Sequence, residues 1–299
     1  MNLREFEEFV VSFSHVQVCS YDAGGGNALA HLIHAMGLKT RFAIDGPSFA
    51  IYSALFPVIS TQNSDGLYPD TDLLISSTGW QSSHEFEIME EALLKGIPVV
   101  AAIDHWVNYK ERFERNGKAI LPTYFIAFDD ESERRIYQEF HSPSVIRVQN
   151  FYTQRVLQEI KDIETQHNSK LFDFVFIGEP LSRSSENDLW TEYDAIKYFF
   201  IALRNYGLTD AKILVKPHPS EEISKYDEFV PSDFKNVKIV TDLDLPWILA
   251  MTKTVVGCHS MALYIAELNG NTVYTAFPDG IQPKVPLDKA KPLMNLAPK

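Results

Sequence analysis

Two adjacent residues with acid–base character, Asp104 and His105, follow an apolar run over residues 97–103 that predicts a buried strand. A carboxylate beside an imidazole is suited to general acid–base catalysis, because each group shifts the pKa of the other. The structural alternative is that Asp104 caps a helix while His105 packs. Because aromatic and hydrogen-bonding residues crowd the same strand end, we interpret it as part of an active site.

A glycine-rich segment, residues 22–27, follows the strand predicted over residues 15–21. Glycines let the backbone approach a ligand closely and expose the amides of the next helix, which we predict over residues 28–36. Asp22 is a further candidate acid or base, with helix capping as the alternative. The glycine spacing matches neither the dinucleotide fingerprint nor the phosphate-binding loop. We therefore predict an acceptor-facing loop that contains Gly24, Gly25, Gly26 and Asn27.

Small residues also follow the next predicted strand, in the segment 76–85. Within it, Trp80 is suited to stacking on a sugar or a base. Glu85 falls in the first turn of the following helix, where a carboxylate is favourable in any case, so we assign it a structural role.

The segment 213–218 joins an apolar strand to a lysine and a histidine. Proline lacks an amide donor, so Pro217 ends the strand pairing and leaves Lys216 and His218 at the carboxyl end of the strand. Ligands of open α/β sheets bind at this edge. An ammonium supplies a compact charge and an imidazole supplies a directional donor, so the pair predicts a phosphate site.

A second anion-binding position is predicted where a strand ends at Gly257 and an apolar helix begins at Ser260. The first amides of a helix lack partners within the helix and favour anions. A plain Ser260 N-cap is compatible with this role. We add His259, which precedes the cap, to the predicted donor site.

Strand and helix patterns alternate along the whole chain, which is typical of α/β domains with parallel sheets. The pattern restarts after a helix and a polar stretch at residues 150–170. The sequence therefore predicts two Rossmann-like, doubly wound domains: an acceptor-side domain over residues 1–165 and a nucleotide-donor domain over residues 166–299.

The 299 residues carry a net charge of −13, which argues against a nucleic-acid-binding protein. The two cysteines, Cys19 and Cys258, build neither a disulfide framework nor a cysteine-rich zinc site, and they favour a cytoplasmic setting. We find no signal-peptide pattern and no apolar run that spans a bilayer, which leaves peripheral contact with the inner membrane face open. No metal-ligand pattern stands out, so we predict no metal and no cofactor. The oligomeric state is left open.

The KPHP motif at residues 216–219, with a downstream helix start at Ser260, resembles bacterial sialyltransferase-like and polysialyltransferase-like glycosyltransferases. It is also similar to the CDP-glycerol glycerophosphotransferases of teichoic acid synthesis. The layout of the whole chain resembles the GT-B fold and the UDP-sugar 2-epimerases related to it. The resemblance implies that Lys216, His218 and Ser260 contact the donor phosphate, and that Gly178 lines a cleft between the domains.

The same resemblance leaves the catalytic base open. The layout of the 2-epimerases implies an acid near Asp104, and that of the CDP-glycerol glycerophosphotransferases implies a histidine such as His105. The sialyltransferase-like families have an acidic motif where this chain has the sequence DAGGG, so Asp22 is a third candidate.

We therefore expect a metal-independent glycosyltransferase of polysaccharide biosynthesis. It would move a sugar from a CMP- or CDP-activated donor, or a UDP-activated one, to a glycan or lipid-linked acceptor. The alternatives are a UDP-sugar 2-epimerase or hydrolase of the same fold and a non-catalytic nucleotide-sugar-binding protein.

Overall fold

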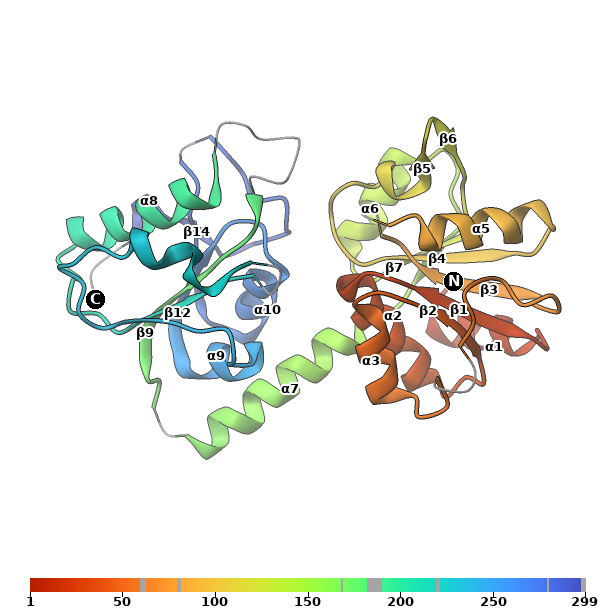
Figure 1. Ribbon diagram of the computed structural model, residues 1–299, viewed down its shortest axis with the longest axis horizontal. Helices are drawn as coiled ribbons and strands as arrows, with labels where there is room; N and C mark the ends of the chain where they lie inside the picture. The colour runs from red at the N-terminus through yellow and green to blue at the C-terminus, as the bar shows by residue number, and fades with distance from the viewer. Residues whose placement is uncertain are drawn as a thin grey trace. The chain divides into compact units, whose positions relative to one another are not determined.

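The computed structural model describes residues 1–59, 63–79, 82–167, 169–181, 190–218, 221–278 and 280–296. The chain divides into two compact units, Met1–Gln154 and Arg155–Lys299, and each is built on a six-stranded parallel sheet (Figure 1). The predicted fold class, two Rossmann-like α/β domains, is confirmed. The division lies near the start of helix α7 (Phe151–Gln166), and the boundary expected at residue 165 lies near its end.

The N-terminal sheet has the strand order β2-β1-β3-β4-β7-β8. Its strands are β1 (Val16–Ser20), β2 (Arg41–Ile44), β3 (Leu73–Ser77), β4 (Val99–Ile103), β7 (Tyr124–Ala127) and β8 (Val145–Arg147). The other elements are α1 (Leu3–Val11), α2 (Ala23–Met36), α3 (Ser48–Leu55), α5 (His84–Leu94), η1 (Glu111–Phe113), β5 (Glu114–Arg115), β6 (Lys118–Ala119) and α6 (Asp130–Glu139). The strand order reverses between β1 and β3, and ligands of open α/β sheets bind at such a switch point.

Strands β1, β3 and β4 are buried along their whole length, because helices cover both faces of the sheet. Figure 1 shows α5 on one side of these strands and α1, α2 and α3 on the other. Leu29 and Leu32 of α2 belong to one apolar cluster, and Ile88 and Met89 of α5 belong to the other. Each buried side chain of this size contributes about 1.5–3 kcal/mol, so this double layer holds the strand ends rigidly in place.

The C-terminal sheet has the order β11-β10-β9-β12-β13-β14. Its strands are β9 (Phe172–Ile177), β10 (Ile213–Lys216), β11 (Val237–Ile239), β12 (Thr252–Gly257), β13 (Thr272–Thr275) and β14 (Lys291–Pro292). The helical elements are α8 (Glu192–Asn205), η3 (Ile223–Phe229), α9 (Leu245–Met251), α10 (Met261–Asn269) and η4 (Leu293–Asn295). Here the order reverses between β9 and β12.

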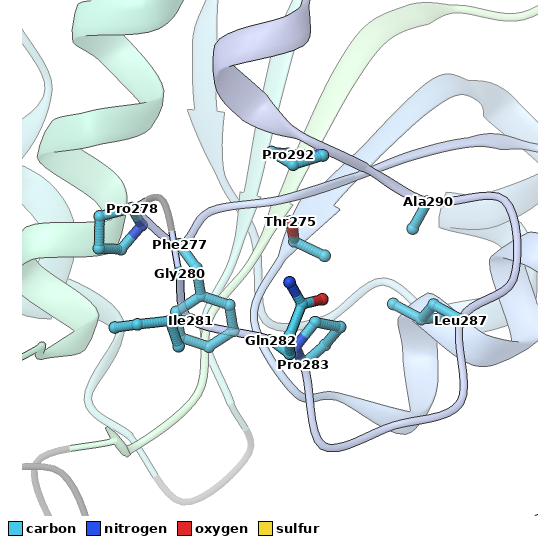
Figure 2. Close-up of a pocket in the computed structure, with 10 residues that line it drawn as sticks. All are labelled: Thr275, Phe277, Pro278, Gly280, Ile281, Gln282, Pro283, Leu287, Ala290 and Pro292. Carbon is cyan, nitrogen blue, oxygen red and sulfur yellow. The ribbon is translucent and has the colours of Figure 1, made fainter.

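A pocket of about 130 Å³ lies beside the end of β13 in this domain (Figure 2). Its lining comes from the end of β13 and the segment that follows it: Thr275, Phe277, Pro278, Gly280, Ile281, Gln282, Pro283, Leu287, Ala290 and Pro292. The sequence analysis assigned none of these residues to a site.

The prediction of a glycine-rich loop before helix α2 is wrong. The helix begins at Ala23, so Gly24, Gly25 and Gly26 form its first turn, and Asn27 donates to the carbonyl of Ala23 at 3.0 Å. Glycine costs a helix about 1 kcal/mol relative to alanine, which favoured a loop from sequence alone. The packing explains the exception: a Cβ atom on Gly24 would lie 2.4 Å from Asp104 Oδ2, and one on Gly26 would lie 2.2 Å from Ser48 Oγ.

Each domain contains one cysteine, and both are buried: Cys19 in β1 and Cys258 just after β12. Among the described residues, no helix is both long and apolar enough to cross a membrane.

Candidate active site

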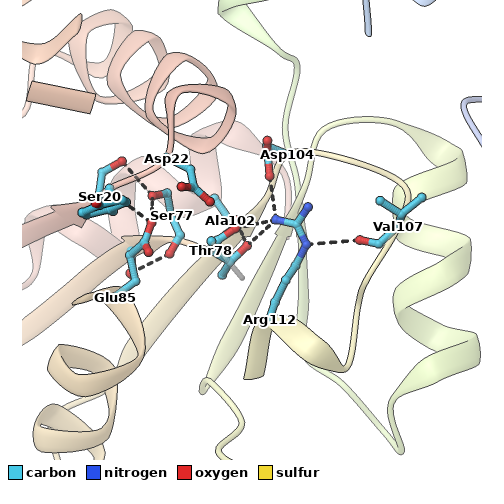
Figure 3. Close-up of polar contacts among 12 residues, drawn as sticks. Ser20, Asp22, Ser77, Thr78, Glu85, Ala102, Asp104, Val107 and Arg112 are labelled. Atoms are coloured by element: carbon cyan, nitrogen blue, oxygen red, sulfur yellow. Dashed lines mark hydrogen bonds and ion pairs between the residues drawn. The ribbon is translucent and has the colours of Figure 1, made fainter. Parts of the chain in front are cut away.

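Asp22 occupies the N-cap position of α2, but among the described residues its side chain makes no capping hydrogen bond. The carboxylate instead lies close to the backbone of Gly79, two residues past the end of strand β3. Figure 3 shows the Asp22 carboxylate in the same cluster as Ser77 and Thr78. A Cβ atom on Gly79 would lie 2.4 Å from Asp22 Oδ2 and 2.9 Å from Glu85 Oε2. The backbone of Gly79 therefore lets two carboxylates from different elements come together.

Glu85, in the first turn of α5, is the second of these carboxylates, and its side chain is only 1% exposed. Its Oε1 atom accepts hydrogen bonds from the backbone amide of Tyr21 at 3.0 Å and from Ser77 Oγ at 2.9 Å. Its place in the helix predicted a structural role for Glu85, and in the structure its side chain lies within the cluster beside Asp22. The small residues that follow β3 were the available signal, since they leave room for its side chain.

Asp104 follows β4 and forms an ion pair with Arg112, whose Nη1 atom lies 2.7 Å from Asp104 Oδ1. The two side chains are 14% and 4% exposed. Arg112 also donates to the carbonyl oxygens of Thr78 and Val107. Asp104 therefore balances a buried guanidinium, a role that no motif in the sequence indicated.

The surroundings of Asp22 in the N-terminal cluster raise the pKa of its carboxyl group. Burial raises the pKa of Asp22 to about 6, with further upward contributions from Glu85 and Asp104 and opposing ones from Arg112 and Arg115. A carboxylate with this pKa is able to accept a proton near neutral pH, which is what a general base requires.

The other residues predicted on this side have different surroundings. The ring of His105 lies 5.2 Å from that of Trp106, whose indole donates to Asp129 at 3.0 Å. The structure thus brings Asp22 and Asp104 together in one cluster with Glu85 and Arg112. It places the ring of His105 against that of Trp106. Trp80 lies outside the described residues.

In the C-terminal domain, Lys216 ends β10, and its Nζ atom donates to the carbonyl of Thr241 at 2.8 Å. Burial lowers the pKa of Lys216, and the charges of Asp244 and Asp242 oppose that effect. His218 is exposed, and its backbone amide donates to Glu221 Oε2 at 2.9 Å. Pro219, the last residue of the KPHP motif, lies outside the described residues.

Glu221 belongs to a buried ionic cluster that supports the His218 backbone. Lys225 Nζ lies 2.5 Å from carboxylate oxygens of both Glu221 and Glu192. Tyr226 Oη donates to Glu221 at 3.2 Å. A Cβ atom on Gly178 would lie 2.6 Å from that same hydroxyl, so Gly178 gives the tyrosine room to reach the cluster.

The start of α10 has the predicted geometry, but the chain itself supplies an anion there. Ser260 Oγ caps the helix by accepting from the amide of Ala262 at 3.2 Å. The amide of His259 donates to Glu179 Oε1 at 2.8 Å, and the amides of Cys258 and Ser260 also bind this carboxylate. Sequence analysis missed Glu179, because nothing in its neighbourhood along the chain indicates a contact with α10.

Protein atoms surround the Glu179 carboxylate, although part of the residue reaches the surface. This burial raises the pKa of Glu179 to about 7, against the effect of the three amides. The ring of His259 is also fixed, because its Nδ1 atom accepts from the amide of Lys284 at 3.0 Å. A neutral His259 therefore carries its proton on Nε2.

No protein-family model matches the sequence, and no curated protein matches it. Solved structures do match. The UDP-GlcNAc 2-epimerase of Neisseria meningitidis bound to UDP-GlcNAc is 12% identical, with a TM-score of 0.63 over 88% of this chain and 82% of that chain. The UDP-GlcNAc 2-epimerase of Methanocaldococcus jannaschii with UDP-GlcNAc and UDP is also 12% identical, with a TM-score of 0.61 over 88% and 83%.

The S. aureus MnaA–UDP structure is 11% identical, with a TM-score of 0.60 over 87% of this chain and 79% of that chain. The fold is GT-B-like. The GT-B-like layout predicted from the sequence is thereby confirmed. Because the identities are so low, these structures show the fold of the chain and do not show its chemistry.

Proposed function

We propose that this chain is an enzyme that acts on nucleotide sugars and uses Asp22 as its proton acceptor. The observation that carries the proposal is the Asp22 carboxylate at the end of β1, with its pKa raised to about 6 and with Glu85 and Asp104 beside it. The leading reaction is glycosyl transfer. Asp22 takes the proton of an acceptor hydroxyl, whose oxygen bonds to the sugar carbon as the bond from that carbon to the phosphate oxygen breaks.

Asp104 is less suited to this role because it balances Arg112. A proton on Asp104 would leave a buried guanidinium without its counter-charge, and disrupting a buried ion pair typically costs about 3–5 kcal/mol. Asp104 would instead hold Arg112 in place beside Asp22. His105 stays as the alternative base.

We assign the nucleotide donor to the C-terminal domain and the acceptor to the N-terminal domain. Lys216, His218, His259 and Ser260 would stabilise the charge of the departing nucleotide phosphate, which is an electrostatic task. UDP is the first nucleotide to test, because it is bound in two of the similar structures, with CMP and CDP next. The acceptor class remains a glycan or lipid-linked sugar, the latter reached by peripheral contact with a membrane.

The test is turnover of a panel of UDP-, CMP- and CDP-sugars, with and without glycan acceptors, measured as release of the free nucleotide. Asp22→Asn should lower kcat by about 10²–10⁴, the usual contribution of a general base. The control is Asp130→Asn, because Asp130 is 99% exposed. Turnover by Asp22→Asn within threefold of the unmodified protein would remove Asp22 from the reaction. Unchanged turnover by His218→Ala would remove His218 from the donor site.

The similarity to UDP-GlcNAc 2-epimerase structures favours a second candidate, epimerisation at C2 of the sugar. In that reaction Asp22 would take its proton from carbon, and no acceptor would be needed. The discriminating measurement is NMR of UDP-GlcNAc incubated with the protein in D₂O. Deuterium at C2 without acceptor indicates epimerisation, and nucleotide release that requires an acceptor indicates transfer. Thermal stabilisation by UDP-GlcNAc without consumption indicates a binding protein.

A further inference from the structure

Glu85 has one carboxylate oxygen, Oε2, with no hydrogen-bond partner among the residues that the structure describes, although the side chain is 1% exposed. Buried polar atoms are nearly always paired, so an unpaired carboxylate oxygen calls for an explanation. The side chain cannot turn to relieve it, because Tyr21 and Ser77 hold the other oxygen. Within the described part of the chain, Glu85 Oε2 is therefore held in place as a free acceptor.

Glu85 Oε2 lies on the same side of Gly79 as the carboxylate of Asp22. Both Glu85 Oε2 and Asp22 Oδ2 lie within 3 Å of the position that a Cβ atom on Gly79 would take. Asp22 in turn lacks the capping hydrogen bond that its position at the start of α2 would offer. Two acceptors that meet in this way repel each other until one of them carries a proton.

Charged groups from several neighbouring elements act on the carboxylates of Asp22 and Glu85. Asp104, after β4, adds a third carboxylate, and Arg112 and Arg115 oppose it with two guanidinium groups. Burial, with a smaller contribution from Glu85, raises the pKa values of Cys19 of β1 and Tyr52 of α3 well above their ordinary range, so both stay neutral. Three carboxylates against two guanidinium groups leave one negative charge that a proton would neutralise.

We propose that Glu85 is a positioning residue for Asp22, and that its Oε2 atom accepts a hydrogen bond from the protonated Asp22 carboxyl group. The proton leaves the reacting hydroxyl and binds Asp22 Oδ2, and the new Asp22 O–H donates to Glu85 Oε2. The electron pair of the broken O–H bond stays on the hydroxyl oxygen, which attacks the sugar carbon as the bond from that carbon to the phosphate oxygen breaks and the nucleotide leaves with that electron pair. The inference rests on the proposed function for the identity of that hydroxyl, whereas the hydrogen bond between the two carboxyl groups is a property of the chain alone.

Replacing Glu85 by glutamine separates the two roles of its oxygens. The amide oxygen would keep the bonds from Tyr21 and Ser77, because both of these groups donate. The amide nitrogen would then take the place of Oε2 and donate to Asp22. This bond favours the charged form of Asp22, so the Glu85→Gln protein should bind the Asp22 proton at least tenfold more weakly.

The experiment is a ¹³C NMR titration of the side-chain carboxyl groups in the full chain without any sugar, with Asp22→Asn used to assign the Asp22 signal. We expect Asp22 to titrate near pH 6 in the unmodified protein and at clearly lower pH in Glu85→Gln. The control is Glu87→Gln, because Glu87 lies two residues on, is exposed and bonds Ser83. An Asp22 titration that is the same in Glu85→Gln as in the unmodified protein would overturn the proposal.

A second variant, Ser77→Ala, covers the case in which Glu85→Gln does not fold. It removes one hydrogen bond to Glu85 Oε1, so Glu85 Oε2 should become a stronger acceptor and Asp22 should take up its proton at higher pH. An unchanged Asp22 titration counts against the proposal. The outcome for the pair is separable from the outcome for the proposed function. A shifted Asp22 titration without turnover of any nucleotide sugar would support the contact between Asp22 and Glu85 and reject the proposed reaction. Turnover with an unshifted titration would support the reaction and reject the contact.

Discussion

The backbone amide of His259 donates to the carboxylate of Glu179 at 2.8 Å, just before the N-cap of α10. The carboxylate of Glu179 thus binds the backbone amides at the helix start for which the sequence predicts a donor phosphate. A phosphate that used these amides would have to displace Glu179, and a protonated Glu179 would be displaced more easily than a charged one. This contact therefore makes Glu179 a residue to test for both stability and nucleotide binding.

We predict that Glu179→Gln flattens the pH dependence of stability. Folding raises the pKa of Glu179 from 4.5 to about 7, so the folded chain holds this proton more tightly than the unfolded chain. The resulting contribution to the free energy of unfolding is complete below pH 4.5 and is lost as the pH rises through 7. Urea unfolding at several pH values measures it. The exposed Glu222→Gln is the control, and equal slopes between pH 4.5 and 7 in both variants would refute the prediction.

We predict that Gly79→Ala separates the carboxylates of Asp22 and Glu85. The new methyl group would meet Asp22 Oδ2 at 2.4 Å and Glu85 Oε2 at 2.9 Å, so both side chains must move. Overpacking of this kind costs about 1–3 kcal/mol. The measurements are the free energy of unfolding and the Asp22 titration. The matched variant Gly66→Ala, where a Cβ atom meets nothing within 4 Å, should change neither, and an identical response of the two variants would exclude the steric explanation.

We predict that Arg112→Met destabilises the N-terminal domain by about 3–5 kcal/mol, because it leaves the charge of Asp104 buried without its partner. The pKa of Asp22 should also rise above 6, since Arg112 normally lowers it. Chemical denaturation and the carboxyl titration measure the two effects. Arg4→Met is the control, because the Arg4 side chain is 86% exposed. A loss of stability below 1 kcal/mol would show that the pair is solvated.

We predict that Lys225→Met weakens binding of UDP as well as folding. Lys225 bridges Glu192 and Glu221, whose side chains are 2% and 0% exposed, and Glu221 holds the backbone amide of His218. Calorimetric titration with UDP gives the change in Kd. The comparison is Lys253→Met, which breaks an exposed ion pair with Asp173 worth at most about 1 kcal/mol. Equal UDP affinity in the two variants would mean that the cluster supports the fold without positioning His218.

The sequence predicts the two sheets well, because their central strands are short apolar runs that end in polar residues. It also predicts that Asp22 and Asp104 lie at the same edge, since parallel strands end together. It does not predict the partners of these residues. Arg112 reaches Asp104, and Glu179 reaches the amide of His259, only through the folding of distant segments.

Glu85 and the glycines of α2 illustrate a different limit. Local propensity predicts a structural role for a glutamate in a first helical turn and a loop for three glycines in a row, and both predictions hold on average. It misses these cases because the tight packing of a neighbouring strand decides them. Asp104 leaves no room for a side chain at position 24, so the helix has a glycine there, and hydrogen bonds from Ser77 and Tyr21 compensate for the burial of Glu85.

The distribution of the thiols has a practical consequence. Cys19 lies in the first strand of the N-terminal sheet and Cys258 just beyond a central strand of the C-terminal sheet, and burial raises the pKa of both thiols. Neither sulfur should react with an alkylating reagent until its own domain opens. Peptide mass spectrometry after timed alkylation would thus report the opening rate of each half separately, in one sample of the unmodified chain.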